Sequence, residues 1–584
     1  MANTIVPRGT ILERRQSKRL CHAKPLPGRP VLQANPPDIL RDNSPLLIHF
    51  CSIQFSGEKH LPTETKRWLG AVWVGLICGF AILHALHLGA DFPNHSPWMH
   101  DWAKYTDEGW YGNAAIRAHL SGHWYVAHDF NPAVALPVWP FLEWLLFFLT
   151  GVSAEAARGL AVAFFFANLV LSYILLRKTG TRGEGLLALT LLVTSPFLYC
   201  FSRLAILEPL LTTLSLLALN LAVRTAEHKR PVLRSVAIGV LFTLMMLTKT
   251  TAIFLLPALA WAMLLPLRGD RRLALRCVVA AAGTIAATYG IWMALVVRSG
   301  LFPDYKYLFY INNYPKPAAR DWLLMSLWWS FHGGLWVDHI LIPLAGVIFV
   351  GALVGGRSAR GRGLLMDPIF GASVAAVAGY IFFMTVQNHP QPRYFAVVAI
   401  FCVFVVARGA AALLKETGGL RQLGWGVIAL ASIAVIVNAS WTLSYAWHPE
   451  YTLVPAAQGL ARYIDQHPNG KRLLVGTSGD EITLIAHVPS LCDDFGTVPL
   501  HDKIAIYQPG WFATWNDLDP GTLADLHTHY SLEQAATFRA MDDPERNRLV
   551  LFKLHPLSNG RVRDQVDQNL QIQLLEDKFD IPIE

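Results

Sequence analysis

The sequence has few charged residues for its length. Asp, Glu, Lys and Arg together make up 15% of the 584 residues, whereas 53% of the residues are hydrophobic. Such an apolar composition excludes an ordinary soluble protein. The length is sufficient for a large membrane domain and one soluble domain. The net charge of +8 is less informative than the positions of the cations along the chain.

Paired cysteines, nucleotide-binding loops and internal repeats are also missing. The 7 cysteines have no paired spacing, so neither a metal knuckle nor a disulfide framework is expected. No glycine-rich nucleotide loop is present, and no nucleic acid is expected among the partners. No apolar segment follows the basic cluster near the start, which argues against a cleaved signal peptide. Residues 1–65 are polar and basic, which favours a disordered cytoplasmic extension; a start codon assigned too far upstream is the alternative.

Hydrophobic segments able to cross about 30 Å of hydrocarbon recur from residue 68 onward. We expect about eleven crossings, near residues 68–88, 158–176, 184–202, 206–223, 235–248, 251–267, 275–297, 338–355, 367–386, 394–412 and 423–442. The apolar stretch 137–150 is too short to span and is interrupted by Pro140 and Glu143. An interfacial or re-entrant helix is therefore expected there.

The positions of the cations support this topology. If 137–150 does not cross, four basic clusters lie in cytoplasmic loops, as the positive-inside rule predicts. These clusters are Arg224/Lys229/Arg230/Arg234, Arg268/Arg271/Arg272/Arg276, Arg357/Arg360/Arg362 and Arg408/Lys415/Arg421. The short outer turns then carry only Arg203, Lys249 and Arg393 as cations.

Three regions follow from this layout. Residues 1–65 form the N-terminal extension. Residues 66–442 form a transmembrane domain with outer loops at 91–157 and 298–337. Residues 443–584 have ordinary charge density and form a small extracytoplasmic domain. The aromatic residues of 298–337 form either a belt at headgroup level or a loop that lines a substrate entrance.

The last region mixes helical and strand patterns. Residues 454–465 are predicted to be helical, and residues 473–476 and 548–554 are predicted strands. The expected fold class is therefore a mainly α polytopic membrane protein of about 11 transmembrane helices plus interfacial helices. A small C-terminal α/β domain lies outside the membrane.

Two adjacent acids stand out in the first outer loop. Asp107 and Glu108 begin the pattern DEGWYGNAAIRAHLSGHW. Its apolar and aromatic residues have the spacing of a helix that lies flat on a membrane surface. Such a helix would hold both carboxylates at the boundary between water and lipid. The alternative is a solvated acidic turn, because Thr106 and Asp107 are good helix N-caps.

Other polar residues fall beside or within spans on the predicted outer side. Charges there are costly and are functional candidates by default. They are Arg203 and Glu208 in SRLAILEP, Lys249 in LTKTT, and His389, Arg393 and Tyr394 in NHPQPRY. Singly, each cation is explained by snorkelling at a helix end. Together, acids and cations on one face suggest a site for a phosphate and a leaving anion.

In order and spacing, these motifs resemble membrane glycosyltransferases of the C-type fold. DEGWY and SGHW look like the first outer loop of the protein O-mannosyltransferase and lipid A aminoarabinose transferase branch. SRLAILEP, LTKTTAIFLLP and QPRYF are similar to later outer turns of that branch, with Glu208 where Asp is usual. The resemblance covers about residues 68–410, and the tail looks like the variable outer domain of bacterial members. The family often has a Lys-Pro pair where this chain reads FNPAVALPVW.

The resemblance implies an inverting transfer of a sugar from a polyprenyl phosphate to an acceptor hydroxyl or amine. The acceptor would be a lipid, a glycan or a protein at the outer face of a bacterial inner membrane, within the cell envelope. In that reading Asp107 and Glu108 are the catalytic acids, with Asp107 as the base. Glu108 and Glu208 orient the acceptor or hold a divalent cation if one is used. No other cofactor is implied. The implied contacts to the lipid phosphate are Lys249, Arg393, Arg203 and Tyr394, with His128, Lys306 and His389 as further candidate substrate contacts.

Two other functions remain open at this point. A transporter or flippase of a lipid-linked sugar would use the same cations but would need no base; inverted repeats would favour it, and none is evident. A polytopic scaffold whose outer domain binds a partner is the third reading, and the order of the outer-turn motifs argues against it.

Overall fold

The computed structural model describes residues 63–311, 320–387, 390–493, 495–516, 518–541, 543 and 546–557. The chain divides into two compact units, Met1–Trp73 and Val74–Glu584. Of the predicted N-terminal extension, residues 1–62 lie outside the described residues. The described chain begins with the helix α3 (Thr63–Ala85), and every later element belongs to the second unit.

The long apolar helices coincide with predicted spans. Seven helices of the described chain are long and apolar enough to cross a membrane. Those seven are α3, α6 (Ala154–Thr179), α10 (Pro231–Thr248), α12 (Arg271–Arg298), α17 (Pro368–Val386), α18 (Phe395–Leu414) and α19 (Gly419–Trp447). The predicted interfacial segment is the short helix α5 (Val138–Thr150). Three predicted spans also contain shorter helices: α9 (Leu207–Ala222), α11 (Leu256–Leu264) and α15 (Leu341–Val354). The polytopic helical class is confirmed, whereas the count of eleven crossings stays a prediction.

The predicted span 184–202 is broken into two helices. α7 (Arg182–Val193) ends before Ser195, and α8 (Pro196–Phe201) begins after it. Pro196 cannot continue a helix because it lacks the backbone N–H and crowds the preceding turn. The Ser195 hydroxyl instead caps α8 by accepting a hydrogen bond from the Leu198 N–H at 3.2 Å. A separate turn between α8 and α9 (residues 202–206) follows at the end of the segment predicted to lie outside.

The aromatic region 298–337 is largely helical where it is described. It contains α13 (Phe302–Lys306), the π-helix η5 (Tyr307–Ile311) and α14 (Arg320–Val337). α14 holds no proline over its length, and the adjacent glycines Gly333 and Gly334 let it approach the Phe395 ring of α18 closely. A helix packed on α18 therefore occupies much of what the sequence suggested was a loop.

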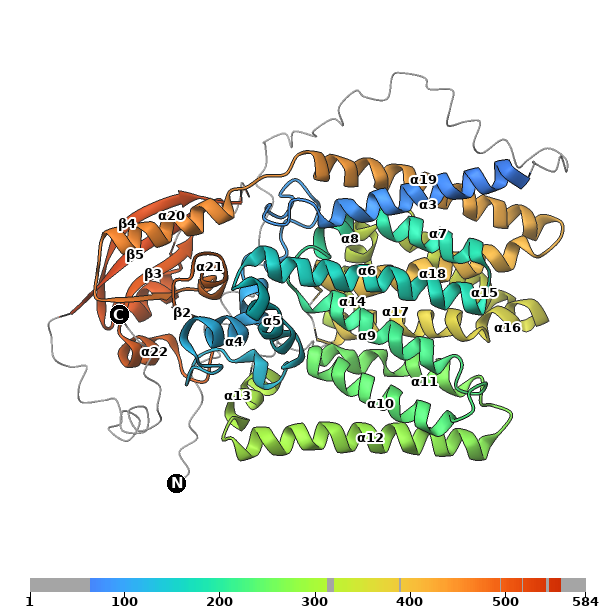
Figure 1. Ribbon diagram of the computed structural model, residues 1–584, viewed down its shortest axis with the longest axis horizontal. Helices are drawn as coiled ribbons and strands as arrows, with labels where there is room; N and C mark the ends of the chain where they lie inside the picture. Colours follow the sequence, from blue (N-terminus) through green and yellow to red (C-terminus); the bar gives the residue numbers. More distant parts are fainter. Residues whose placement is uncertain are drawn as a thin grey trace, which may run out of the picture. The chain divides into compact units, whose positions relative to one another are not determined.

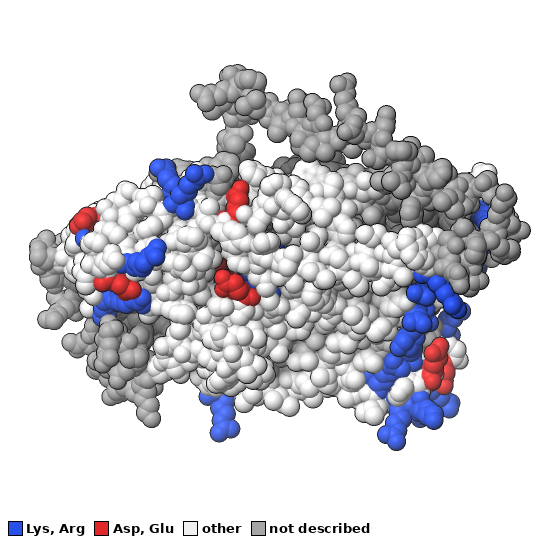
Figure 2. Space-filling model, turned by 45° about the horizontal axis from the view of Figure 1, so that its top comes forward, with Lys and Arg blue, Asp and Glu red and all other residues white. Residues whose placement is uncertain are grey.

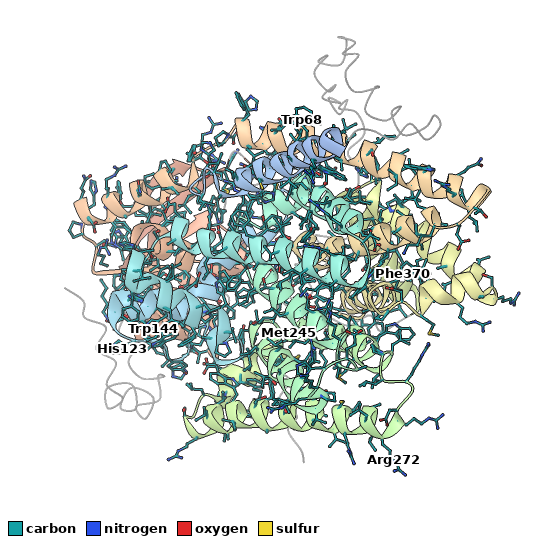
Figure 3. All side chains as sticks on the ribbon, turned by 45° about the vertical axis from the view of Figure 1, so that its right-hand side comes forward. Trp68, His123, Trp144, Met245, Arg272 and Phe370 are labelled. Carbon is teal, nitrogen blue, oxygen red and sulfur yellow. The ribbon has the colours of Figure 1, made fainter. Side chains whose placement is uncertain are left out.

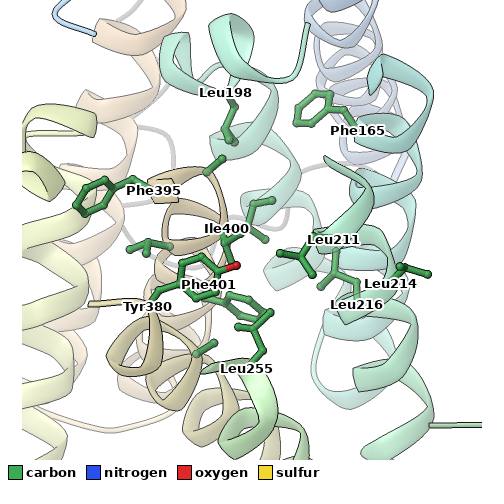
Figure 4. Close-up of a cluster of buried hydrophobic side chains, with 14 of the residues drawn as sticks. Phe165, Leu198, Leu211, Leu214, Leu216, Leu255, Tyr380, Phe395, Ile400 and Phe401 are labelled. Carbon is green, nitrogen blue, oxygen red and sulfur yellow. The ribbon is translucent and has the colours of Figure 1, made fainter. Parts of the chain in front are cut away.

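The helices pack side by side in pairs, and α18 packs against α7, α15, α17 and α19. α10 lies along α12, α6 along α9, and α17 along α18 (Figure 1). Residues 395–410 of α18 are all buried except the half-buried Ala399, and their side chains meet those of α8, α9 and α17 in the apolar cluster of Figure 4. Figure 3 shows Met245 and Phe370 inside the bundle, whereas Arg272 extends from the end of α12. Lipid tails are as apolar as these side chains, so close van der Waals packing rather than removal from water holds membrane helices together.

The connecting helices are short. They comprise η2 (Trp102–Lys104), α4 (Asp107–Ser121), η3 (Pro132–Val134), η4 (Thr250–Leu255), η6 (Gly355–Arg357), α16 (Ala359–Leu365) and η7 (Pro392–Tyr394). Figure 2 shows a large group of Lys and Arg side chains at the lower right edge of the face in view and smaller groups toward its left end. α5 has 13 residues, so it is about 20 Å long and too short for a hydrocarbon core of about 30 Å.

The C-terminal part is a five-stranded sheet with helices. The strands are β1 (Lys471–Val475), β2 (Ser490–Leu491), β3 (Pro509–Trp515), β4 (Tyr530–Arg539) and β5 (Arg548–Pro556), in the order β2-β1-β3-β5-β4. β1 is parallel to β2 and β3, whereas β5 is antiparallel to β3 and β4. The helices are α20 (Leu453–Gln466), α21 (Gly479–Ala486), α22 (Leu500–Tyr507) and α23 (Pro520–Leu526). The predicted α/β class and both predicted strands are confirmed.

Candidate active site

The two acids of the DEGWY motif occupy the first turn of α4 but face different neighbours. Asp107 and Glu108 are both buried. Neighbouring side chains on a helix diverge by about 100°, because one turn takes about 3.6 residues. Asp107 faces η7, where it pairs with Arg393, and Glu108 faces α6, where it pairs with Arg158. The predicted pair of acids is therefore split between two environments.

Asp107 shares Arg393 with a second carboxylate. The Arg393 Nε lies 3.1 Å from the Asp107 Oδ2, an ion pair without hydrogen-bond geometry. The Arg393 Nη1 and backbone N–H donate to the two carboxylate oxygens of Asp101, at 2.6 and 2.9 Å. Burial raises the pKa of Asp107, the charge of Asp101 adds to this, and Arg393 opposes it. Asp107 is thus a buried carboxylate whose Oδ2 accepts no hydrogen bond.

Lys249 and Glu208 form the second half of the same cluster. The Lys249 ammonium donates to the Glu208 carboxylate between the end of α10 and the start of α9. The same ammonium lies 4.6 Å from the centre of the Tyr394 ring and 5.9 Å from that of Tyr111. The positive charge of Lys249 lowers the pKa of Asp107, and the negative charge of Glu208 raises it. Residues from α4, α9, α10 and η7 therefore converge on one place, as the order of the outer motifs predicted.

The charges of this cluster are unequal. Three carboxylates (Asp101, Asp107 and Glu208) face two cations, Lys249 and Arg393. An incoming anion must therefore draw the cations away from their carboxylates or enter while one carboxyl group is protonated. A buried carboxyl whose pKa is raised takes up a proton most readily. Arg and Lys at such a position match a phosphate in charge and hydrogen-bond geometry.

Glu108 is engaged outside this cluster. Its two oxygens accept from the Arg158 guanidinium at 2.8 and 2.6 Å, and one also accepts from the Ala205 N–H at 2.8 Å. The pair joins α4 to α6 and to the turn before α9. A carboxylate held in this way fixes the position of neighbouring segments, so the geometry favours a structural part for Glu108 rather than the predicted catalytic one.

Arg203 also lies apart from Asp107 in its contacts. Its Nη2 donates to the carbonyls of Leu86 (2.7 Å) and His87, just beyond α3, and its guanidinium stacks 4.5 Å from the centre of the Tyr199 ring. These carbonyls need donors because they follow the last turn of a helix. The position favours a helix-capping part for Arg203 over the predicted phosphate contact.

The remaining candidates are dispersed. His128 has a left-handed backbone conformation (φ 62°), and its ring lies 3.4 Å from the Thr497 hydroxyl in the C-terminal domain. Lys306 is the exposed last residue of α13. His389 lies outside the described residues. Tyr394 is buried beneath the two cations, at 4.6 Å from Lys249 and 5.2 Å from the Arg393 guanidinium carbon.

Sequence reasoning missed Asp101, Arg158 and the acids of α21. Arg158 could have been found, because an arginine in an apolar span needs a partner. Asp101 carries no local signal: its partner Arg393 is 292 positions away. Among the described residues, no three His, Cys, Asp or Glu side chains are placed to hold a metal ion.

One segment of the chain matches a known protein family, and the fold matches solved structures. Residues 132–292 match the family model described as dolichyl-phosphate-mannose-protein mannosyltransferase. Two crystal structures of ArnT from Cupriavidus metallidurans, in the apo state and bound to undecaprenyl phosphate, superimpose with TM-scores of 0.56 and 0.55. Each is 14% identical, and the match covers 83% and 82% of this chain and 98% of each ArnT chain. No curated protein sequence matches the chain.

Proposed function

Because this chain has the C-type fold of membrane glycosyltransferases and resembles their protein O-mannosyltransferase and lipid A aminoarabinose transferase branch, we propose that it transfers a sugar from a polyprenyl phosphate. The acceptor is a hydroxyl or an amine of a lipid, a glycan or a protein. The observation that carries the proposal is the cluster around Asp107: a buried carboxylate with an unbonded oxygen beside two buried cations.

The chemistry assigns a part to each member of the cluster. Asp107 removes the proton of the acceptor as the acceptor oxygen or nitrogen bonds to the anomeric carbon. The bond from that carbon to the phosphate oxygen breaks, and its electron pair stays on the phosphate. Lys249 and Arg393 stabilise the phosphate, which leaves as an anion without needing a proton. Attack opposite the leaving group inverts the anomeric configuration.

Glu208 and Asp101 act through the cations. In the unliganded chain they neutralise Lys249 and Arg393, so neither cation is buried alone. A phosphate that enters the site takes over part of that pairing. Glu208 is then released to orient the acceptor.

The positions of the cations along the chain support the orientation of the protein. Along the sequence, about one helix separates each of the four basic clusters from the nearest motif of the Asp107 cluster. The clusters therefore fall at the opposite membrane face, as the positive-inside rule expects for cytoplasmic loops. The site and the C-terminal domain then face the outside of a bacterial inner membrane.

The pH dependence of the reaction follows from the Asp107 carboxyl. A base acts in its ionised form, so kcat/KM rises with pH through the pKa of Asp107 in the free enzyme. Since burial raises this pKa, the rise lies above the ordinary value for Asp of about 3.9. In Asp101→Asn the charge that raises the pKa of Asp107 is gone, so the rise is expected at lower pH. The measurement is kcat/KM against pH, with the exposed Asp465→Asn as control; a rise that keeps its position or moves upward contradicts the assignment.

A deletion strain tests the proposal in the cell. Without the transferase, its donor is made but not consumed. A polyprenyl-phosphate sugar is expected to accumulate in the native lipid extract, and expression of the wild-type chain should remove it. Its mass gives the class of sugar, such as hexose, pentose or amino sugar. An unchanged lipid profile in the deletion strain would argue against the proposed donor class.

A further inference from the structure

The first turn of α4 is capped by a residue far away in the sequence. Thr106, at the N-cap position, caps no backbone N–H of the helix; its hydroxyl donates instead to the Asp107 Oδ1 at 3.2 Å. The first N–H groups of a helix have no intrahelical acceptor and are normally satisfied by such a cap. Here the Gly109 N–H donates to the Glu481 Oε2 at 2.9 Å, across 372 positions of the chain. Glu481 belongs to α21 in the C-terminal domain.

More contacts join the same face of α4 to α21 and the turn before it. The Trp110 indole N–H donates to the Thr477 carbonyl at 3.1 Å. The Asn113 amide and the Arg117 guanidinium donate to the two oxygens of Asp480 at 3.2 and 3.3 Å. Gly109, Asn113 and Arg117 are spaced by four residues and so share one face of the helix. α4 therefore lies between the C-terminal domain and the Asp107 cluster.

Gly109 makes this approach unusually close. A Cβ atom at this position would lie 2.2 Å from the Asp480 carbonyl carbon and 2.2 Å from the Glu481 nitrogen. The two backbones are thus in direct contact two residues after Asp107. Any shift of α21 must shift the first turn of α4.

Glu481 suits a cap that carries no charge. It is buried beside Glu108, and its Oε1 has no hydrogen-bond partner. Burial raises the pKa of Glu481 well above its ordinary value, and the charge of Glu108 adds to this. A neutral carboxyl group still accepts a hydrogen bond through its carbonyl oxygen, and a glutamine side chain offers the same acceptor.

We infer that Glu481 is a positioning residue: the C-terminal domain caps α4 from outside and thereby sets the place of the Asp107 carboxylate. The inference rests on the proposed function, since it gives Glu481 its part through Asp107. It makes the C-terminal domain a component of the active site, while Glu481 itself touches neither donor nor acceptor.

The test compares two substitutions of one residue. Glu481→Met fills the buried space but removes the acceptor for the Gly109 N–H, whereas Glu481→Gln retains it. We expect kcat of Glu481→Met to fall by about 10-fold to 10²-fold, the scale of a misplaced catalytic group. Glu481→Gln should keep kcat close to that of the wild type, and both variants should keep the donor Kd. Glu533→Gln, on the exposed strand β4 of the same domain, is the matched control.

Hydrogen exchange provides a readout that does not depend on activity. Amides of residues 106–113 should exchange faster in Glu481→Met than in the wild type, and not in Glu481→Gln. Wild-type kcat and exchange in Glu481→Met, or equal damage in both variants, overturns the inference. If Glu481→Met does not fold, Glu481→Ala is measured with the same expectations. Absence of transfer by the wild type would instead reject the proposed function, and the exchange data would still decide whether Glu481 caps α4.

Discussion

The Asp107→Asn variant is expected to lose about 10²-fold or more in turnover, the usual scale for a lost general base. Asparagine keeps the size of the side chain and most of its hydrogen bonding but cannot take up the acceptor proton. The variant should fold, because Arg393 keeps both hydrogen bonds to Asp101 and so remains paired. Donor affinity should survive, since Lys249 and Arg393 are unchanged.

Sugar release from a polyprenyl-phosphate donor in detergent, measured beside donor binding, checks this expectation. Asp465→Asn is a suitable control, because Asp465 lies in an exposed ion pair with Arg472. Near-normal turnover in Asp107→Asn would remove Asp107 from the mechanism. Glu208 would then be the acid to test next, because the Arg158 guanidinium and the Ala205 N–H already occupy Glu108.

Removal of Lys249 should separate folding from donor binding. In Lys249→Met, Glu208 stays buried without its cation, and breaking a buried ion pair in this way costs about 3–5 kcal/mol. In Lys249→Met/Glu208→Gln neither charge is left, so most of that stability should return. Donor binding should not return, because the phosphate has lost one of its two cations.

Thermal unfolding and donor Kd of the single and double variants separate the two roles of Lys249, which are to neutralise Glu208 and to bind the donor phosphate. A stable double variant that binds donor as the wild type does would show that Lys249 serves only to neutralise Glu208. Glu208→Gln alone is the informative control: it frees Lys249 in the unliganded chain, and donor should bind at least as tightly as to the wild type.

The membrane helices were predictable because their signal is local. A run of about 20 apolar residues identifies a span without knowledge of its neighbours, and α6, α12 and α17 lie where such runs occur. The predicted strands at 473–476 and 548–554 correspond to β1 and β5, because short apolar segments of this kind are also a local signal. The break at Pro196 had a local signal too, but the apolar residues on both sides concealed it.

Residue pairing was not predictable, because each partner lies far away in the sequence. Outer-turn position and motif order gathered Asp107, Glu208, Lys249 and Arg393, and the structure places these four together. The same reasoning could not foresee that the two cations are already neutralised by Asp101 and Glu208. Nor could it separate Arg203, whose guanidinium serves carbonyls beyond the end of α3. Such contacts depend on tertiary packing, for which a single sequence carries no pattern.

Sugar transfer by the purified wild type is the decisive measurement, because transfer distinguishes a glycosyltransferase from a flippase of the same lipid. The protein is incubated with a panel of polyprenyl-phosphate sugars and acceptors, and both the glycosylated acceptor and the freed polyprenyl phosphate are quantified by mass. The same preparation in vesicles is assayed for movement of the donor between leaflets. A glycosyltransferase yields equal amounts of the two products, and NMR coupling constants of the glycosylated acceptor should show the inverted anomeric configuration. Donor movement between leaflets without either product, across the whole panel, would contradict the proposed function and favour a flippase.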